Sequence, residues 1–383
     1  MRFLHTGDWH VGRSIRGRSR DEEFAGALDE VIAIAIDEKV DLVLVAGDIY
    51  DQRAVSADAD RLVFGALLRL SSAGIPVVAI PGNHDSAARL DAIAPLLERI
   101  GVSLVCKMRP PAQGGALTVP ARDGTHSARI SCLPFVSPRH FSSATQLFDD
   151  VSSGYIEFDQ GMGNLLTAYE RAFDAAAVNV VLGHLFVSGA QPGGGEREIT
   201  IGADFAIAPA HLPATANYVA LGHIHRPQAV RGAPGPARYC GSLIQLDFGE
   251  RDQDKSVVIV DAQPGRRAQT RVIPITSGRR LTDVSGTLEG LAAVAERVGD
   301  AYLRATVMVD HPIPGIADRV REILPNVLDV RLDYERDEKE VRPTLRGMEP
   351  SEQFVAYYKE HHGTEPAQEL LAAFDRVYEE VRG

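Results

Sequence analysis

Short apolar runs alternate with longer stretches of mixed polarity along the first hundred residues of the chain. Residues 41–46 and 77–80 are almost entirely apolar and have the length of buried strands, and residues 2–6 predict a third. Apolar residues recur at helical spacing in the stretches that follow, at 21–39, 57–73 and 87–100. This alternation indicates βαβ units and a largely parallel sheet with both faces covered. Further strands are expected at 102–106, 128–134, 178–182, 218–221 and 256–261.

The pattern changes in the last third of the chain. Helices at 288–298 and 316–323 alternate with strands at 302–309 and 328–333, which is enough for a small α+β domain. A polar, proline-containing linker follows, and two amphipathic helices at 351–358 and 368–381 end the pattern. We therefore expect three parts, with the bounds 1–275, 276–340 and 341–383.

Composition and charge exclude some classes of protein. The 40 Lys and Arg residues against 52 Asp and Glu residues give a net charge of −12, which excludes a generically basic coat for nucleic acid. A local basic patch or a metal site remains compatible with that charge. Three cysteines are too few for a disulfide framework and fit a reducing compartment. Without a signal pattern or a long apolar run, we expect a cytoplasmic protein with no membrane partner.

Five short polar clusters come directly after predicted strands. Each cluster taken alone is more typical of a turn than of a site. Together they bring carboxylates, an amide and several imidazoles to strand ends, a set of oxygen and nitrogen ligands that suits Mn²⁺, Fe²⁺ or Zn²⁺. A carboxylate in a short turn is the natural bridge between two metals, and Asp48 is the candidate. The clusters are Asp8-Trp9-His10, Gly47-Asp48, Gly82-Asn83-His84-Asp85, Gly183-His184 and Gly222-His223-Ile224-His225.

The order and spacing of these clusters resemble the signature of the calcineurin-like metallophosphoesterases. The longer segments GDIYDQR at 47–53, LGHLFVSGA at 182–190 and YVALGHIHRPQ at 218–228 resemble the Mre-type nuclease family within that superfamily. The resemblance implies an α/β metallophosphoesterase β-sandwich flanked by helices, a small α+β capping domain and C-terminal helices. It implies a nuclease domain at 1–275, a DNA-capping domain at 276–340 and a helical tail at 341–383 that binds a partner ATPase.

The resemblance also implies a role for each cluster residue. Asp8, His10, Asp48 and His225 would hold a first metal, and Asp48 would bridge to a second held by Asn83, His184 and His223. His84 matches the catalytic histidine of the family and would assist the leaving oxygen. Asp85 either orients His84 or caps the turn, and both alternatives stay open. The segment 241–246 lacks the prolines that are common in the family, which bears on loop rigidity near the site.

The implied activity is that of a two-metal DNA nuclease. It would use Mn²⁺, with Mg²⁺, Fe²⁺ or Zn²⁺ as alternatives, as an exonuclease on double strands and an endonuclease on single strands and hairpins. The implied partners are DNA, a second copy of the chain and a coiled-coil ATPase, with ATP used only through that ATPase. Four arginines follow the first cluster and predict contacts with DNA phosphates, although a solvated charged loop is the alternative. They are Arg13, Arg16, Arg18 and Arg20.

Two other functions are weighed against this one. A small-molecule phosphodiesterase acting on cyclic nucleotides would share the clusters, but such enzymes usually end soon after the last histidine motif. This chain continues for about 158 residues beyond His225. A catalytically silent scaffold protein is the non-enzymatic alternative, and the presence of all seven candidate ligands and His84 argues against it.

Overall fold

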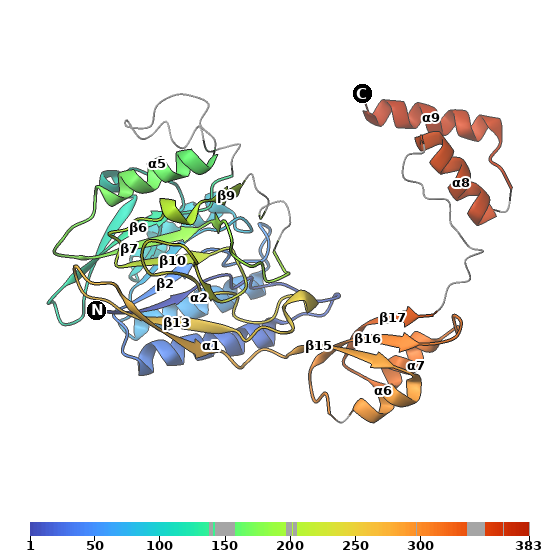
Figure 1. Ribbon diagram of the computed structural model, residues 1–383, viewed down its shortest axis with the longest axis horizontal. Coiled ribbons are helices and arrows are strands. Elements are labelled where there is room, and N and C mark those ends of the chain that lie inside the picture. Colours follow the sequence, from blue (N-terminus) through green and yellow to red (C-terminus); the bar gives the residue numbers. More distant parts are fainter. Residues whose placement is uncertain are drawn as a thin grey trace. The chain divides into compact units, whose positions relative to one another are not determined.

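The computed structural model describes residues 1–137, 141, 158–196, 201, 205–295, 297–334, 349–362 and 364–382 (Figure 1). The chain divides into two compact units, one of Met1–Met308 with Pro314–Leu332 and one of Val309–Ile313 with Asp333–Gly383. The expected boundary at residue 275 falls inside the first unit. The expected boundary at residue 340 lies outside the described residues.

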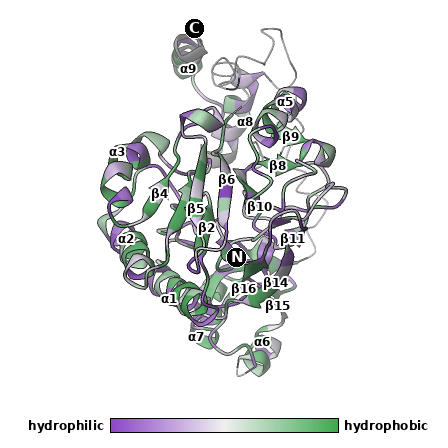
Figure 2. Ribbon diagram, turned by 90° about the vertical axis from the view of Figure 1, so that its left-hand side faces the viewer, coloured by the Kyte–Doolittle hydropathy of each residue, from purple (hydrophilic) through white to green (hydrophobic). Residues whose placement is uncertain are grey.

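The first sheet has six strands in the order β14-β13-β1-β2-β3-β4. Its four parallel strands β1–β4 are joined by α1, α2 and α3, and β13 and β14 add antiparallel neighbours at one side. Figure 2 shows these helices along one side of the sheet. The bounds are β1 (Arg2–Thr6), α1 (Asp21–Asp37), β2 (Leu42–Ala46), α2 (Ala57–Ser72), β3 (Val77–Ile80), α3 (Ala87–Glu98), β4 (Val102–Leu104), β13 (Ser256–Asp261) and β14 (Gln269–Pro274).

The second sheet also has six strands, in the order β11-β12-β10-β7-β6-β5. The four central strands are parallel, and β5 and β11 form antiparallel edges. The bounds are β5 (Ala116–Pro120), β6 (Ser127–Leu133), α5 (Phe158–Glu170), β7 (Val178–His184), β10 (Tyr218–Gly222), β11 (Gln228–Ala229) and β12 (Ala237–Tyr239). Smaller elements are β8 (Phe186–Val187), β9 (Ala206–Ile207), η1 (Pro111–Gln113), η4 (Pro209–His211) and η5 (Phe248–Glu250).

The two sheets pack face to face because alternate strand residues point to opposite sides. Phe3 and Leu44 of the first sheet belong to one buried cluster with Val180 and Tyr218 of the second. The intervening Leu4 joins the cluster formed with α1 and α2 on the outer face. The residue pattern therefore predicted the parallel strands correctly but not their division between two sheets, and the β-sandwich implied by the resemblance is confirmed.

A smaller three-stranded sheet occupies the region of the expected capping domain. It contains β15 (Leu281–Gly286), β16 (Tyr302–Met308) and β17 (Val327–Asp333), with α6 (Leu288–Val294) and α7 (Ile316–Ile323). Leu281 and Tyr302 pack with Ile15 and Phe248 in a small buried cluster, so this sheet belongs to the first unit. Strands β5, β14 and β15 were absent from the expected elements because their partly exposed residues give a weak apolar pattern.

The second unit contains the two expected tail helices, α8 (Pro350–His362) and α9 (Gln368–Arg382). They form a hairpin in which the rings of Phe354 and Phe374 stack with centroids 4.4 Å apart. The hydroxyl of Ser351 donates a hydrogen bond to the Asp375 carboxylate at 2.6 Å. Among the described residues, no helix has the length and apolar character needed to cross a bilayer.

Candidate metal centre

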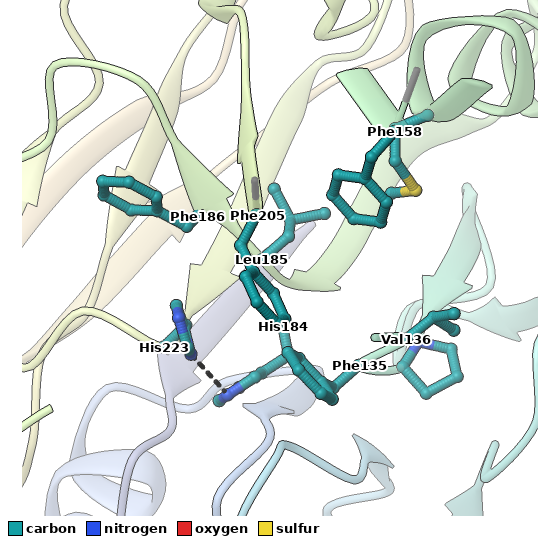
Figure 3. Close-up of a pocket in the computed structure, with 10 residues that line it drawn as sticks. Phe135, Val136, Phe158, His184, Leu185, Phe186, Phe205 and His223 are labelled. Carbon is teal, nitrogen blue, oxygen red and sulfur yellow. Dashed lines mark hydrogen bonds between the residues drawn. The ribbon is translucent and has the colours of Figure 1, made fainter. Parts of the chain in front are cut away.

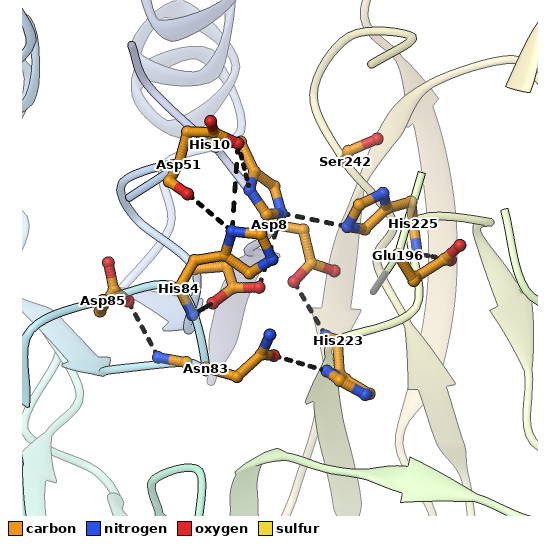
Figure 4. A network of polar contacts seen from close by, with 12 residues as sticks. Asp8, His10, Asp51, Asn83, His84, Asp85, Glu196, His223, His225 and Ser242 are labelled. Atoms are coloured by element: carbon orange, nitrogen blue, oxygen red, sulfur yellow. Dashed lines mark hydrogen bonds and ion pairs between the residues drawn. The ribbon is translucent and has the colours of Figure 1, made fainter. Parts of the chain in front are cut away.

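The seven candidate ligands meet at the carboxyl ends of the parallel strands of both sheets. They follow or end β1, β2, β3, β7 and β10, where strand-end loops of the two sheets face one another (Figure 4). Each is at most 7 % exposed. The structure therefore brings together every residue that the sequence analysis named as a ligand: Asp8, His10, Asp48, Asn83, His184, His223 and His225.

Asp48 lies between two groups of candidate ligands. Its carboxylate oxygen Oδ2 is 3.5 Å from Nε2 of His10 and 3.4 Å from Nε2 of His184. Asp48 forms one group with His10 and His84 and another with Asp8 and His184, with the ligand atoms of each group within 4.8 Å of one another. A carboxylate shared by two such groups has the position that a bridging ligand requires.

The remaining ligands complete these groups. Nε2 of His225 lies 3.0 Å from Nε2 of His10. The side-chain oxygen of Asn83 lies 3.0 Å from Nε2 of His184 and 2.8 Å from Nδ1 of His223. Carboxylate, amide and imidazole donors thus converge in a buried space without any thiolate among the described residues.

This donor set fits divalent metal ions. The Oδ2 atom of Asp8 is buried and has no hydrogen-bond partner among the described residues. A buried carboxylate oxygen without a partner is costly, and a bound cation would satisfy it. The mixture of oxygen and nitrogen donors suits Mn²⁺, Fe²⁺ or Zn²⁺. The residues therefore fit a divalent-metal site.

Burial and close charges perturb the protonation of the ligands. Burial raises the pKa of Asp8 to about 6 and lowers the pKa of His10 to about 4. Burial also opposes the ionised form of Asp48, but the neighbouring His184 holds the pKa of that carboxyl well below its usual range. In turn, burial opposes the charged form of His184, and Asp48 nevertheless raises its pKa to about 9. Because ligand imidazoles are neutral, a metal ion would displace this proton.

The loops that carry the ligands are held in strained backbone conformations. Asp8, His10 and Asp48 have φ values of 47°, 50° and 47°, and His223 has a φ of 98°. Residues with side chains in this region cost about 1–3 kcal/mol each and persist only where surrounding contacts fix them. Two such contacts join the first two loops, since the amides of Asp8 and His10 donate to the carbonyls of Gly47 and Asp48 at 2.9 and 3.0 Å.

Outer partners orient two of the ligand imidazoles. Nδ1 of His225 lies 2.9 Å from Oε1 of Glu250, and Nδ1 of His184 lies 2.7 Å from the carbonyl oxygen of Ala46. Because both partners are acceptors, each Nδ1 carries a proton and each Nε2 is the nitrogen that a metal would bind. The sequence analysis assigned no role to Glu250, because no spacing rule connects it with His225 before the chain is folded.

His84 lies at the edge of the same site. Its Nδ1 is 2.6 Å from the carbonyl oxygen of Asp51, so this nitrogen donates a hydrogen bond to that carbonyl. Its backbone amide donates to Oδ1 of Asp48 at 2.8 Å. Asp85 accepts hydrogen bonds from the backbone amides of Gly82, Tyr50 and Ile49 at 2.9, 2.9 and 3.1 Å. These bonds favour the turn-capping alternative for Asp85.

The four arginines after the first cluster have different surroundings. Arg13 pairs with Asp51 at 3.1 Å, and the exposed Arg16 lies 3.5 Å from Asp329. Arg18 is also exposed, and its guanidinium lies 5.6 Å from the centroid of the Tyr302 ring.

The burial of Arg20 contradicts the expectation that this residue contacts DNA. It is 2 % exposed and pairs with Glu23 at 2.6 Å. It also donates to the carbonyl oxygen of Gln245. A buried, paired guanidinium has no free face for a phosphate, so Arg20 is a structural residue that joins the arginine loop to α1 and to the segment before η5.

A two-sheet α/β fold that carries a buried cluster of candidate metal ligands at its strand ends is typical of a metallophosphoesterase. Residues 1–227 match the family described as calcineurin-like phosphoesterase, which identifies the protein as a phosphodiester hydrolase. Residues 277–362 match the family described as type 5 capsule protein repressor C-terminal domain.

Curated relatives narrow the class further. The SbcD subunit of the nuclease SbcCD from Bacillus subtilis (strain 168) is 32% identical over 98% of this chain and 97% of its own length. The protein of the same name in Escherichia coli (strain K12) is 29% identical over 92% of each chain. This chain belongs to the SbcD family of SbcCD nuclease subunits, which confirms the resemblance drawn from the sequence.

Proposed function

We propose that this chain is the Mn²⁺-dependent nuclease subunit of an SbcCD-type complex. It would act as an exonuclease on double-stranded DNA and as an endonuclease on single strands and hairpins. The processes served would be DNA end processing, replication, repair and recombination. The observation that carries the proposal is the position of Asp48, which lies in two groups of buried residues able to hold a metal, one with His10 and one with His184. Such an arrangement suits in-line displacement at a phosphodiester.

The proposal assigns the ligands to two sites. Asp8, His10, Asp48 and His225 would hold the first metal, and Asp48, Asn83, His184 and His223 the second. The short separation of Nε2 of His10 from Nε2 of His225, 3.0 Å, supports the first set. The convergence of Asn83, His184 and His223 supports the second. Two bound Mn²⁺ ions would lower the pKa of a water and offset charge on the phosphate oxygens.

His84 is the proposed general acid. The Asp51 carbonyl holds the proton on its Nδ1. A proton on Nε2 can then pass to the leaving oxygen of the diester. General acid catalysis of this kind contributes about 10²- to 10⁴-fold to the rate.

Substitution of His84 tests this role. We expect His84→Ala to lower kcat by about 10²- to 10⁴-fold while the Mn²⁺ content stays unchanged, because the residue donates a proton and is not one of the seven assigned ligands. The exposed His126 supplies the matched control, His126→Ala. Near-normal turnover of His84→Ala with both metals bound would contradict the assignment.

The surface beside the site supports DNA as the substrate. Arg13, Arg16 and Arg18 would contact phosphates and position the strand. The three-stranded sheet of β15, β16 and β17 would cap and position duplex DNA.

The partners are also part of the proposal. The chain would act as a homodimer, with ATP used only through an SbcC-type coiled-coil ATPase docked on the α8–α9 hairpin. Exposed Leu68 of α2 and Leu96 of α3 support a dimer contact on those helices, at 50 % and 69 % exposure. The cytoplasmic location expected from the sequence stays a prediction.

Incubation with labelled hairpin DNA tests the whole proposal. The purified protein, alone and with the ATPase, is compared in Mn²⁺ and in Mg²⁺. We expect Mn²⁺-dependent opening of the hairpin and degradation of double-stranded ends that increases with the ATPase. Cleavage of bis(p-nitrophenyl) phosphate without any cleavage of DNA would instead favour a small-molecule phosphodiesterase, and inactivity on both would favour a silent scaffold.

A further inference from the structure

An apolar recess lies directly beside two of the metal ligands. Its wall contains the rings of Phe135, Phe158 and Phe205, together with the ligands His184 and His223 (Figure 3). Phe135 comes just after β6, Phe158 begins α5 and Phe205 precedes β9. Three segments that are far apart in sequence therefore place aromatic rings at one point of the site.

The rings form a row that starts at a metal ligand. Phe135 stacks on His223 with centroids 6.1 Å apart and planes at 26°, and it meets His184 edge-on at 6.2 Å. Phe205 stacks on Phe135 at 6.2 Å with planes at 11°, and Phe158 lies 6.4 Å beyond Phe205. The row thus leads outward from the ligands.

These rings are more exposed to solvent than the candidate ligands beside them. His184 and His223 are 1 % and 2 % exposed, whereas Phe135, Phe158 and Phe205 are all partly exposed. Partly exposed aromatic rings beside a polar metal centre lose part of the stabilisation that full burial would give. None of the three rings supplies a ligand or a proton for hydrolysis. Their remaining exposed surface lies where a group of the substrate can contact it.

We propose that this aromatic row stacks an unpaired nucleobase of the DNA strand next to the scissile phosphate. The inference rests on the proposed nuclease function and names the part of the substrate that the exposed ring faces contact. Phe135 touches two metal ligands, so a base stacked on the row would belong to a nucleotide at the phosphodiester being cut. Every base has a π-face, so such stacking is tolerant of sequence.

The proposal specifies the state of the DNA at the site. A base inside a duplex already stacks on its neighbours, and taking it out of the stack costs energy. Bases in single strands, hairpin loops and frayed ends are unstacked at little or no such cost. The aromatic row therefore selects unpaired nucleotides, and a duplex end must open before its terminal bases reach the row.

A substrate that lacks the base tests the proposal without altering the protein. Single strands carrying either thymidine or an abasic tetrahydrofuran residue on either side of the scissile bond are compared in Mn²⁺. We expect kcat/KM of the wild-type protein to fall by about 5- to 150-fold when the stacked base is absent. Equal rates on both strands would overturn the inference and leave the nuclease function intact. Hydrolysis of methyl p-nitrophenyl phosphate without cleavage of any DNA would overturn the nuclease function itself.

Substitution of the rings completes the test. Phe135→Leu should lower kcat/KM on the natural strand and remove the further loss caused by the abasic residue. Phe205→Leu, one ring further from the ligands, should also lower kcat/KM on the natural strand and reduce the further loss caused by the abasic residue. This second variant keeps the test valid if Phe135→Leu disturbs the metal ligands. Phe173→Leu is the control for loss of a partly buried ring that, like Phe158, packs against the hydrophobic cluster of α5, β7 and β10. Full sensitivity to the abasic residue in both row variants would overturn the inference, because another group would then receive the base.

Discussion

Glu250 is completely buried and yet charged. It accepts from Nδ1 of His225 at 2.9 Å and pairs with Nζ of Lys255 at 2.7 Å. Burial opposes its ionised form, but Lys255 and His225 hold the pKa of the carboxyl well below its usual range. An ionised carboxylate can only accept, so it keeps the proton of His225 on Nδ1 and leaves Nε2 for a metal.

Neutralising Glu250 should therefore weaken the metal site. We expect Glu250→Gln to lower the affinity for Mn²⁺ by about 10- to 100-fold, because the amide can present its nitrogen and release the imidazole from its orientation. Isothermal titration of the metal-free protein with Mn²⁺ measures this directly. The exposed Glu289→Gln on α6 is the control. A lower Tm with unchanged Mn²⁺ affinity would show that Glu250 only stabilises the fold.

Two arginines of one short loop differ in their surroundings, since Arg20 is buried and Arg16 is exposed. Arg20→Met should cost about 3–5 kcal/mol of unfolding free energy, because it leaves the carboxylate of Glu23 buried without its partner. The exposed Arg16→Gln should change stability by less than about 0.5 kcal/mol. It should reduce the slope of log K for DNA against log salt by about 1.

Chemical denaturation and DNA-binding titrations over a range of salt concentrations measure the two effects separately. A stable Arg20→Met protein would count against the structural role of Arg20. An unaltered salt slope in Arg16→Gln would count against a phosphate contact.

At the scale of elements, the junctions between strands and loops decide whether the ligands can meet. A Cβ atom on Gly82, which follows β3, would overlap the carboxylate and the backbone nitrogen of Asp48. The loops after β2 and β3 therefore approach so closely that only glycine fits. By contrast, a Cβ on Gly65 in α2 would meet nothing within 4 Å.

These two glycines give a matched pair of variants. Gly82→Ala should displace Asp48 and weaken Mn²⁺ binding by at least about tenfold, on the scale of other changes that misorient ligands. Gly65→Ala should raise the unfolding free energy by about 0.5–1 kcal/mol, because alanine loses less backbone entropy in a helix. Metal titration and thermal unfolding of both variants check the pair. Wild-type metal affinity in Gly82→Ala would refute the role of this close approach.

At the scale of the whole molecule, the net charge of −12 is an average over unlike regions. The carboxylates at the strand ends are buried, and in our proposal they bind cations. The exposed arginines beside them would contact DNA phosphates.

The α8–α9 hairpin exposes large apolar side chains to solvent. Tyr357, Leu370 and Val377 of the α8–α9 hairpin are 55 %, 41 % and 60 % exposed. Large exposed apolar side chains on paired helices are typical of a surface that docks on another helix.

The hairpin should therefore bind the ATPase independently of the metal centre. Leu370→Glu together with Val377→Glu should abolish co-purification with the ATPase, because two charges would be buried in the contact. Mn²⁺-dependent cleavage of short single strands should stay unchanged. Ala372→Glu, an exposed position on the opposite face of α9, is the control. Retained co-purification of the double variant would place the docking surface elsewhere.

The sequence by itself indicated the seven candidate ligands, through the resemblance to a known family, and most of the elements that carry them. Buried parallel strands and their helices have strong apolar periodicity, so β1–β3 and α1–α3 were expected within a few residues of their bounds. Polar residues at the ends of parallel strands must lie at one edge of a sheet, which is why Asp8 and Asp48 could be paired before the fold was known.

Features that depend on packing between distant segments of the chain could be identified only from the tertiary structure. A continuous apolar run shows that a strand is buried, but not which sheet it joins, so only the tertiary structure shows the division into two sheets. Arg20 and Arg16 look alike in sequence, and only the position of Glu23 and Gln245 makes one structural. Likewise Glu250 reaches His225, and Phe135 meets Phe205, through contacts that no local spacing encodes. The helices, the strands and the polar clusters at strand ends depend on neighbours in the chain, so the local sequence pattern indicates them. The orientation of the candidate ligands and the contacts between the aromatic rings depend on neighbours in space, so only the tertiary structure shows them.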